Sequence, residues 1–352
     1  MIYTEAYFAC NFGDDLMVRT LLNNFPDVKF YLCGEKSKLR CFNDLNNVVM
    51  PNKIESFVTR VNRKLFKSRI DYPFGYKQSD VIVKIGGSIF IEYNGWERNY
   101  SVFDKPTFIL GCNFGPYKTE SFLNATRERI KHVEDCCFRD SYSYSLFFEN
   151  SKARLATDIV FAYDELPEVN HDASFVGISV IDFMNRGELA PHMDAYETGI
   201  IEICLRYIHL GKKIKFFNFC SMEGDRLAIN RIISTLSELV DNISHYIEIV
   251  DYDGDHKYML NEMNQCHIIY ATLFHAMIVG WLLRKKVAPI IYSRKQLNIL
   301  NDMGYNEAIW NIGKGDSLDF ECLAPRALSK EKIESLKNNA YEQFLVLKTK
   351  LR

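Results

Sequence analysis

The chain has 352 residues, which is too long for one ordinary α/β core and fits two domains of ordinary size. Hydrophobic residues make up 47% of the chain and charged residues 25%, which are globular values that argue against extensive disorder. The net charge of -2 argues against nucleic acid as the main partner, because binding to phosphates depends on an excess of Lys and Arg.

Compartment is indicated by the apolar segments and the cysteines. The longest apolar stretch, around residues 276–283, falls far short of the ~20 residues that a membrane span needs. The first residues lack the basic and apolar regions of a secretory signal. Cys10, Cys112, Cys220 and Cys266 lie in strand-like apolar runs, where cysteine serves as a small buried hydrophobe, and no C-x-x-C pair occurs. We expect a cytoplasmic protein without a metal site.

A basic run occupies residues 60–69, with the sequence RVNRKLFKSR. It indicates either a solvated helix face or contact with an anionic membrane surface or a lipid-diphosphate acceptor. We expect at most peripheral membrane contact, at the inner face of the membrane.

Predicted strands and helices alternate along the first half, which is typical of parallel α/β architecture. The sequence predicts strands at 6–10, 28–33, 81–85 and 107–110, helices at 16–24 and 120–132, and a short strand that ends at residue 138. The basic, Asn-rich stretch that ends near residue 77 receives no predicted element.

The polar segment 164–172 contains a proline and no periodicity, so it predicts a linker. Strands are predicted after it at 175–181, 214–219, 246–250, 268–271 and 288–292. Two helices, over 193–207 and 229–239, keep a 3.6-residue apolar period, and the helix at 274–283 is apolar on all sides and therefore central. A capping pattern at Ser329 begins a charged amphipathic tail helix.

The predicted organisation is an N-terminal Rossmann-like domain at 1–168, a C-terminal Rossmann-like domain at 169–328, and a helix at 329–352 that packs back on the first domain. Two α/β halves that face each other leave a cleft at the carboxyl ends of their strands.

Small and polar residues gather in the loops at these strand ends. Gly13 permits a tight turn into a helix whose N-terminus binds anions, although Asp14 can simply cap that helix. Arg139 can clamp a phosphate or carboxylate, or pair with Asp140 or Asp158 for structure. His275 is either a proton-transfer group or a satisfied core residue. The other candidate substrate-binding residues are Asn11, Gly86, Gly87, Asn113, Gly115, Ser143, Tyr292, Arg294 and Lys295.

The chain lacks the Walker, G-x-G-x-x-G, G-x-S-x-G and H-E-x-x-H motifs, which excludes the commonest NTPase, dehydrogenase, hydrolase and zincin readings. Weak motifs occur instead in a fixed order: Asn-x-Gly-Asp at 11, Gly-Gly at 86, Gly-x-Asn-x-Gly-Pro at 111, Arg-Asp-x-x-Ser at 139, Thr-Asp at 157, His275 before an apolar helix, and Tyr-x-x-Lys at 292. This series resembles the polysaccharide pyruvyltransferase family over residues 11–295.

The resemblance implies a fold similar to the two-domain GT-B glycosyltransferases. It also implies transfer of the enolpyruvyl group of phosphoenolpyruvate onto two hydroxyls of a sugar, with a lipid-linked oligosaccharide as the expected acceptor and no cofactor. By position, His275 matches the family's active-site histidine, and Arg139 and Lys295 match basic residues that would bind the donor anion. Asp14 is a candidate base or acceptor-binding group.

One position departs from the family pattern. Leu273 stands where the family's Ser-Arg-x-His motif has its arginine, and either Arg294 or Arg284 has to compensate if the donor is the same. Two other functions stay open, a glycosyltransferase that uses a nucleotide sugar, with Glu223 or Asp225 at the ribose, and a non-catalytic sugar-binding relative.

Overall fold

The computed structural model describes residues 1–66, 71–99, 104–184, 186–305, 309–314, 318–320 and 323–352. The chain divides into two compact units. Unit 1 comprises Met1–Phe8, Asp14–Tyr163 and Ser335–Arg352, and unit 2 comprises Ala9–Gly13 and Asp164–Glu334. The sequence analysis placed the boundary five residues later, after residue 168, and assigned the loop at 9–13 to the first domain.

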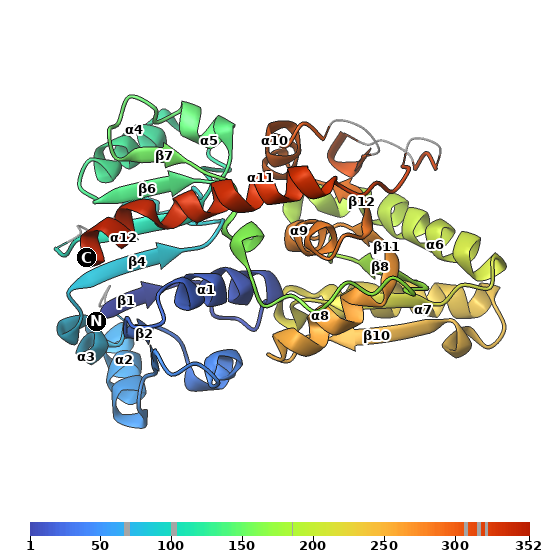
Figure 1. The fold of residues 1–352 in the computed structure, drawn as a ribbon, viewed down its shortest axis with the longest axis horizontal. Helices are drawn as coiled ribbons and strands as arrows, with labels where there is room; N and C mark the ends of the chain where they lie inside the picture. Colours follow the sequence, from blue (N-terminus) through green and yellow to red (C-terminus); the bar gives the residue numbers. More distant parts are fainter. Residues whose placement is uncertain (67–70, 100–103, 185, 306–308, 315–317, 321–322) are drawn as a thin grey trace. The chain divides into compact units, whose positions relative to one another are not determined.

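Unit 1 is built on a parallel sheet with the strand order β3-β2-β1-β4-β5-β6-β7 (Figure 1). The strands are β1 (Ile2–Glu5), β2 (Phe30–Leu32), β3 (Val48–Val49), β4 (Val81–Ile85), β5 (Thr107–Cys112), β6 (Asp135–Phe138) and β7 (Ala153–Leu155). The chain order reverses between β1 and β4, and in open α/β sheets ligands bind at the carboxyl ends of the strands beside such a reversal. All six residues of β5 are buried, as expected for a strand covered on both faces.

The helices of unit 1 follow the strands in the usual crossover pattern. They are α1 (Phe12–Asn24), α2 (Lys53–Phe66), α3 (Pro73–Gln78), α4 (Glu120–Ile130), α5 (Ser141–Ser145) and α12 (Leu345–Leu351). Two stacked aromatic pairs belong to the core beside β5 and β6, with the centroids of Phe114 and Phe122 5.5 Å apart and those of Phe138 and Phe147 5.1 Å apart.

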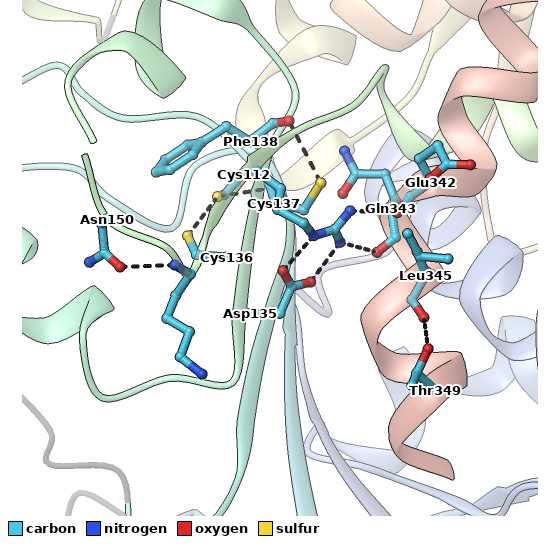
Figure 2. A network of polar contacts seen from close by, with 12 residues as sticks. Cys112, Asp135, Cys136, Cys137, Phe138, Asn150, Glu342, Gln343, Leu345 and Thr349 are labelled. Atoms are coloured by element: carbon cyan, nitrogen blue, oxygen red, sulfur yellow. Dashed lines mark hydrogen bonds and ion pairs between the residues drawn. The ribbon is translucent and has the colours of Figure 1, made fainter. Parts of the chain in front are cut away.

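The C-terminal segment, Ser335–Arg352, packs on the rest of unit 1 through buried polar contacts. Figure 2 shows Asp135, Glu342 and Gln343 at this place. The Gln343 amide accepts a hydrogen bond from the Gly111 N–H at 2.9 Å and donates one to the Ala156 carbonyl at 3.1 Å. Arg154 forms a bidentate ion pair with Asp135 and also donates to the Glu342 carbonyl. The segment therefore completes the hydrogen bonding at the end of β5.

Unit 2 repeats the architecture with the strand order β10-β9-β8-β11-β12-β13, again all parallel. Its strands are β8 (Phe175–Ser179), β9 (Ile214–Asn218), β10 (Ile247–Asp251), β11 (Cys266–Ala271), β12 (Lys286–Ile291) and β13 (Trp310–Asn311). Its helices are α6 (Met193–His209), α7 (Asp225–Leu239), α8 (His256–Asn264), α9 (Phe274–Leu282) and α10 (Arg294–Asp302), and α11 (Lys330–Tyr341) leads from it to the C-terminal segment. The reversal in this sheet lies between β8 and β11.

The predicted alternation of strands and helices is confirmed, with one strand misplaced. The strand predicted at 6–10 is wrong, because β1 is Ile2–Glu5 and Cys10 stands in a turn with a φ of 52°. The residues Ile2–Glu5 pair with β4 and three of them pair with β2, so the backbone hydrogen bonds of a central strand fix the earlier register. Cys112, Cys220 and Cys266 are buried as predicted, but Cys220 lies just after β9, and Cys10 is only partly buried.

Several elements escaped prediction. The Asn-rich stretch contains β3, α2 and α3, and helices α8 and α10 of unit 2 were not predicted either. Among the residues that the structure describes, none of the helices combines the length and the apolar character that crossing a membrane requires.

Candidate functional site

The carboxyl edge of the unit 1 sheet brings together Gly86, Gly87, Asn113, Gly115, Arg139 and Ser143, all predicted as site residues. The Asn113 N–H donates to the Gly87 carbonyl at 2.9 Å, which joins the loops after β5 and β4. A Cβ atom on Gly87 would lie 2.1 Å from an Nη of Arg139, so only glycine lets the backbone pass the guanidinium so closely.

Arg139 follows β6 and its side chain is 3% exposed. Its guanidinium donates to Asp158 at 2.7 Å and to the Asn113 side-chain oxygen at 3.0 Å. The sequence left Asp140 and Asp158 open as structural partners, and in the structure the ion pair is with Asp158. A fully buried pair of this kind keeps its charges only because each partner compensates the other.

Asp140 instead caps helix α5. It accepts hydrogen bonds from the Ser143 N–H and the Ser143 hydroxyl, both at 2.8 Å, and the same hydroxyl accepts from the Phe114 N–H at 2.8 Å. Ser143 therefore holds the loop at 113–116, with its hydroxyl donating to Asp140 and accepting from the Phe114 N–H. Its predicted contact with substrate stays a prediction.

In unit 2, the loop Ala9–Gly13 lies against the residues that follow β9. The Phe12 N–H donates to the Phe219 carbonyl at 3.1 Å, and the Asn11 amide donates to Glu223 at 3.1 Å. The Asn11 side-chain oxygen also accepts from the Gly13 N–H at 3.0 Å, a local bond that starts helix α1. The first-turn residue Asp14, the candidate base, is partly buried.

His275 stands in the first turn of α9, at the carboxyl end of β11, beside the reversal of strand order in unit 2. A Cβ atom on Gly13 would lie 1.9 Å from Nδ1 of His275, so the backbone of the loop runs directly against the imidazole ring. Two residues that are 262 positions apart, both predicted from the sequence as site residues, therefore meet in one unit.

Thr272 and Leu273, the residues before His275, are held by hydrogen bonds and core packing. The Leu273 N–H donates to the Ser179 hydroxyl at 3.2 Å, and the Thr272 hydroxyl lies 2.9 Å from that of Tyr196. The Leu273 side chain packs against the hydrophobic core of unit 2. Where the family pattern has an arginine, this chain has an apolar side chain used for packing.

Tyr292, Arg294 and Lys295 follow β12 at the same edge of the sheet. Arg294 is the first residue of α10 and is exposed, and Lys295 is partly buried. Arg284, the other residue that could replace the family arginine, follows the C-terminal end of α9, whereas His275 lies at its N-terminal end. A nine-residue helix is about 14 Å long, so most of the length of α9 separates Arg284 from His275.

An acidic cluster follows β8 and β9, and the sequence had indicated its members Glu223 and Asp225 but not Asp182. Glu223 accepts from Asn11 and from Arg186 at 2.8 Å, and Asp182 accepts from Arg231 at 2.6 Å. Asp182 directly follows an apolar strand, which was the available signal, but a single aspartate there has many structural uses.

Asp225 is the most deeply buried carboxyl group of this cluster, at 1% exposure. It accepts a hydrogen bond from the Cys220 N–H at 3.1 Å, while its other carboxyl oxygen has no hydrogen-bond partner among the described residues. Burial raises the pKa of Asp225 to about 7, and the Glu223 carboxylate adds to the increase. In the part of the chain that the structure describes, no group of three or more His, Cys, Asp or Glu side chains is arranged to hold a metal ion.

Solved structures share the fold over nearly the whole chain. A UDP-GlcNAc 2-epimerase from Methanocaldococcus jannaschii is 12% identical, with a TM-score of 0.54 over 99% of both chains. A glycosyltransferase from Rickettsia africae is also 12% identical, with a TM-score of 0.52 over 99% of this chain and 96% of that chain. HepE from Anabaena, solved with UDP and glucose, is 9% identical, with a TM-score of 0.51 over 98% of this chain and 94% of that chain. At these identities the likeness shows the GT-B-type fold alone.

Sequence comparison gives the family. The amylovoran biosynthesis protein AmsJ of Erwinia amylovora is 21% identical in an alignment of 264 positions that covers 66% of this chain and 61% of that protein. The chain thus spans under two thirds of the length of this relative. The family model for polysaccharide pyruvyl transferase matches residues 11–294, a range that contains Asn11, Arg139 and His275. The chain therefore belongs to the polysaccharide pyruvyl transferase family.

Proposed function

We propose that this chain transfers the enolpyruvyl group of phosphoenolpyruvate onto two hydroxyls of a sugar in a bacterial surface-polysaccharide precursor. The products are a cyclic pyruvate ketal and free phosphate. The family match over residues 11–294 carries the proposal. The similarity to a protein named for amylovoran biosynthesis supports an exopolysaccharide precursor as the acceptor, and a lipid-linked oligosaccharide is the form we expect.

The chemistry requires a proton donor for the methylene carbon, positive charge for the donor's phosphate and carboxylate, and a base for the attacking hydroxyl. We assign His275 either the donation of the proton to the methylene carbon, as general acid, or the binding of the donor's phosphate. Its place beside the strand reversal, against the backbone of Gly13, supports this assignment. Asp14 stays the candidate base.

The cationic residues contribute unequally to donor binding. The guanidinium of Arg139 already bonds to Asp158 and Asn113, so a donor anion would share a charge that is largely compensated. Arg294 is exposed at the start of α10 and is followed by Lys295. We therefore expect Arg294 and Lys295 to supply more donor affinity than Arg139, whose main effect is to hold Asn113 and Gly87 in position.

Leu273 lowers the expected donor affinity relative to family members with arginine there. A charge-assisted hydrogen bond contributes about 1.5–3 kcal/mol, which corresponds to about 10- to 150-fold in affinity. On this proposal Arg294 supplies the compensating charge. Leu273→Arg is expected to tighten phosphoenolpyruvate binding if its side chain reaches the same anion.

The test is incubation of the protein with phosphoenolpyruvate and a panel of lipid-linked sugar precursors, with mass spectrometry to detect the ketal and an assay for released phosphate. Thermal-shift measurements with phosphoenolpyruvate, UDP-sugars and GDP-sugars accompany it, because a ligand that binds the native state raises the melting temperature. Stabilisation by a nucleotide sugar alone would indicate a glycosyltransferase. No phosphate release with any acceptor would indicate a non-catalytic sugar-binding relative.

A further inference from the structure

Helix α2 (Lys53–Phe66) of unit 1 is oriented by buried polar contacts along one face. The Glu55 carboxylate accepts hydrogen bonds from the Tyr31 hydroxyl and from the Gly75 N–H, and the Thr59 hydroxyl accepts from the Tyr72 N–H at 2.8 Å. Glu55 is 3% exposed and Thr59 is 4% exposed. Because residues four apart share a helix face, these contacts define the inward side of α2.

The outward side of α2 carries large apolar side chains in solvent. Ile54 is 69% exposed and Phe57 is 63% exposed, and the two lie three residues apart on one face of the helix. Figure 1 shows α2 at the margin of unit 1 beside α3. The outward face is completed by the exposed cations Lys53, Arg60 and Lys64 and by the partly buried Val61.

These residues are sorted by type around the helix. At 100° per residue, Phe57 lies near the middle of the outward face, Ile54 and Val61 lie on one side of it, and the three cations lie on the other side. An apolar ridge with a parallel basic flank is the pattern of a helix that lies in the plane of a membrane interface. The apolar side chains enter the headgroup region while the cations contact anionic headgroups.

The charges argue against a second copy of the chain as the occupant. In a two-fold dimer the same patch meets itself, so Lys53, Arg60 and Lys64 would face the same three cations of the partner. The outward face defined above has no acidic residue to offset this repulsion, since the carboxylate of Glu55 is turned inward. The occupant that complements the face is therefore an anionic, partly apolar surface.

We propose that the outward face of α2, formed by Lys53, Ile54, Phe57, Arg60, Val61 and Lys64, binds the surface of membranes that contain anionic lipids. This surface extends the proposed function, because it would bring the enzyme to an acceptor that is itself attached to lipid. Membrane binding by α2 needs neither donor nor acceptor, so it can be measured independently of the transfer reaction.

The experiment is flotation of the full chain with vesicles of phosphatidylglycerol and phosphatidylcholine, compared with vesicles of phosphatidylcholine alone. We expect binding to the anionic vesicles that weakens as the ionic strength is raised from 0.1 M to 0.5 M, since salt screens the basic flank. The double variant Ile54→Gln/Phe57→Gln is expected to lose at least about tenfold in partitioning. Lys64→Gln is expected to lose about fivefold, from about 1 kcal/mol per cation near an anionic surface.

The matched control is Leu210→Gln/Lys212→Gln, which removes an exposed leucine and an exposed lysine from the turn after α6 in unit 2. Leu210 is 65% exposed, as accessible as Ile54 and Phe57. We expect this variant to bind vesicles as the wild type does, and all variants to keep the wild-type unfolding temperature within a few degrees.

Three results would overturn the proposal. They are equal binding to neutral and anionic vesicles, unchanged binding of the Ile54→Gln/Phe57→Gln variant, and a concentration-dependent dimer in lipid-free ultracentrifugation that this variant abolishes. If the protein forms the ketal but does not bind vesicles, only the membrane-binding proposal is rejected. If it binds vesicles but forms no ketal, only the proposed transfer reaction is rejected.

Discussion

Gly13 makes the position of His275 sensitive to a single methyl group. Gly13→Ala would place a Cβ atom 1.9 Å from Nδ1 of His275, so the imidazole has to turn away. Because a displacement of about 1 Å at a reacting group can cost about 100-fold, we expect kcat/KM for phosphoenolpyruvate to fall by about 10- to 100-fold. Steady-state kinetics measure the loss, and denaturant unfolding checks that the protein stays folded.

The His275→Ala background separates this effect from a general disturbance of α1. If Gly13 acts through the imidazole, the Gly13→Ala change adds no further loss once the ring is gone. An equal loss in both backgrounds would mean that the loop contributes by itself and that His275 is not the group it positions.

Asp225 links the stability of unit 2 to pH. An aspartate whose folded pKa is raised binds a proton more tightly in the native state than in the unfolded state. Its contribution to stability is therefore lost as the pH rises from about 4, near the pKa of unfolded Asp, to about 7, the folded value. Asp225→Asn keeps an oxygen that can accept from the Cys220 N–H and does not ionise.

We expect Asp225→Asn to gain stability relative to wild type as the pH increases from 5 to 8, by about 1–4 kcal/mol, since one pKa unit corresponds to 1.36 kcal/mol. Urea unfolding of both proteins at the two pH values measures the difference. A pH-independent difference would show that Asp225 keeps an ordinary pKa in the folded protein.

Single residues also show which features of the site could be predicted from the sequence and which could not. Gly13 and His275 were predicted because glycine after a strand and histidine before an apolar helix are visible as local patterns, and their contact needed coordinates. Ser143 was predicted to bind substrate, and the structure adds that its hydroxyl bonds to Asp140 and the Phe114 N–H, which the sequence did not show. Whether a polar side chain at a strand end serves a ligand or its neighbours depends on partners distant in sequence.

At the scale of elements, prediction succeeded where the hydrophobic pattern was long and unmixed. The strand Val81–Ile85 was predicted with its observed bounds, and helix α6 has the predicted 3.6-residue period. Strands β3 and β13 have two residues each, which is too short for a period to be visible. Helix α2 was not predicted although Ile54, Phe57, Val58 and Val61 have the i, i+3, i+4, i+7 spacing of an amphipathic helix, because the stretch was interpreted from its basic, Asn-rich composition.

The C-terminal segment is an element whose docking rests on one buried amide. Gln343 is 0% exposed and bonds to the Gly111 N–H and to the carbonyls of Ala156 and Thr157. Gln343→Leu keeps a similar volume but leaves these backbone groups without their partner, at about 1–3 kcal/mol for each buried unsatisfied group. We expect a loss of about 2–4 kcal/mol in the free energy of unfolding.

Hydrogen exchange distinguishes local from general effects of this change. Loss of the amide partner predicts faster exchange at Gly111, at the end of β5 next to Asn113, while strands of unit 2 keep their protection. Thr349→Ala, on the exposed side of α12, is the control and is expected to change stability by less than about 0.5 kcal/mol. Unchanged exchange at Gly111 in Gln343→Leu would contradict the assigned role.

At the scale of the whole molecule, the two units repeat one plan. In each sheet the first strand of the unit lies inside, with the second and third strands on one side of it and the later strands on the other. The alternation of elements predicted two parallel α/β halves, because parallel strands need crossover connections, and the strand order within each sheet comes from the structure. The assignment of Ala9–Gly13 to unit 2 was not predictable, because it rests on contacts with Phe219 and Glu223 more than 200 residues away.

The sequence predicted both Arg139 of unit 1 and His275 of unit 2 as donor-binding residues, and kinetics can test whether the two act on one ligand. If they act on the same phosphoenolpyruvate molecule they are coupled, and the combined loss in kcat/KM of Arg139→Lys and His275→Asn is then smaller than the product of the single losses, by about tenfold. The control pair is Arg139→Lys with Arg231→Lys, because Arg231 bonds to Asp182 and Glu197 within unit 2. Its effects are expected to multiply, since changes at sites that share no partner are independent. Multiplicative losses in the first pair as well would mean that Arg139 and His275 serve different ligands, and the donor site would then have to be assigned within unit 2, around His275, Arg294 and Lys295.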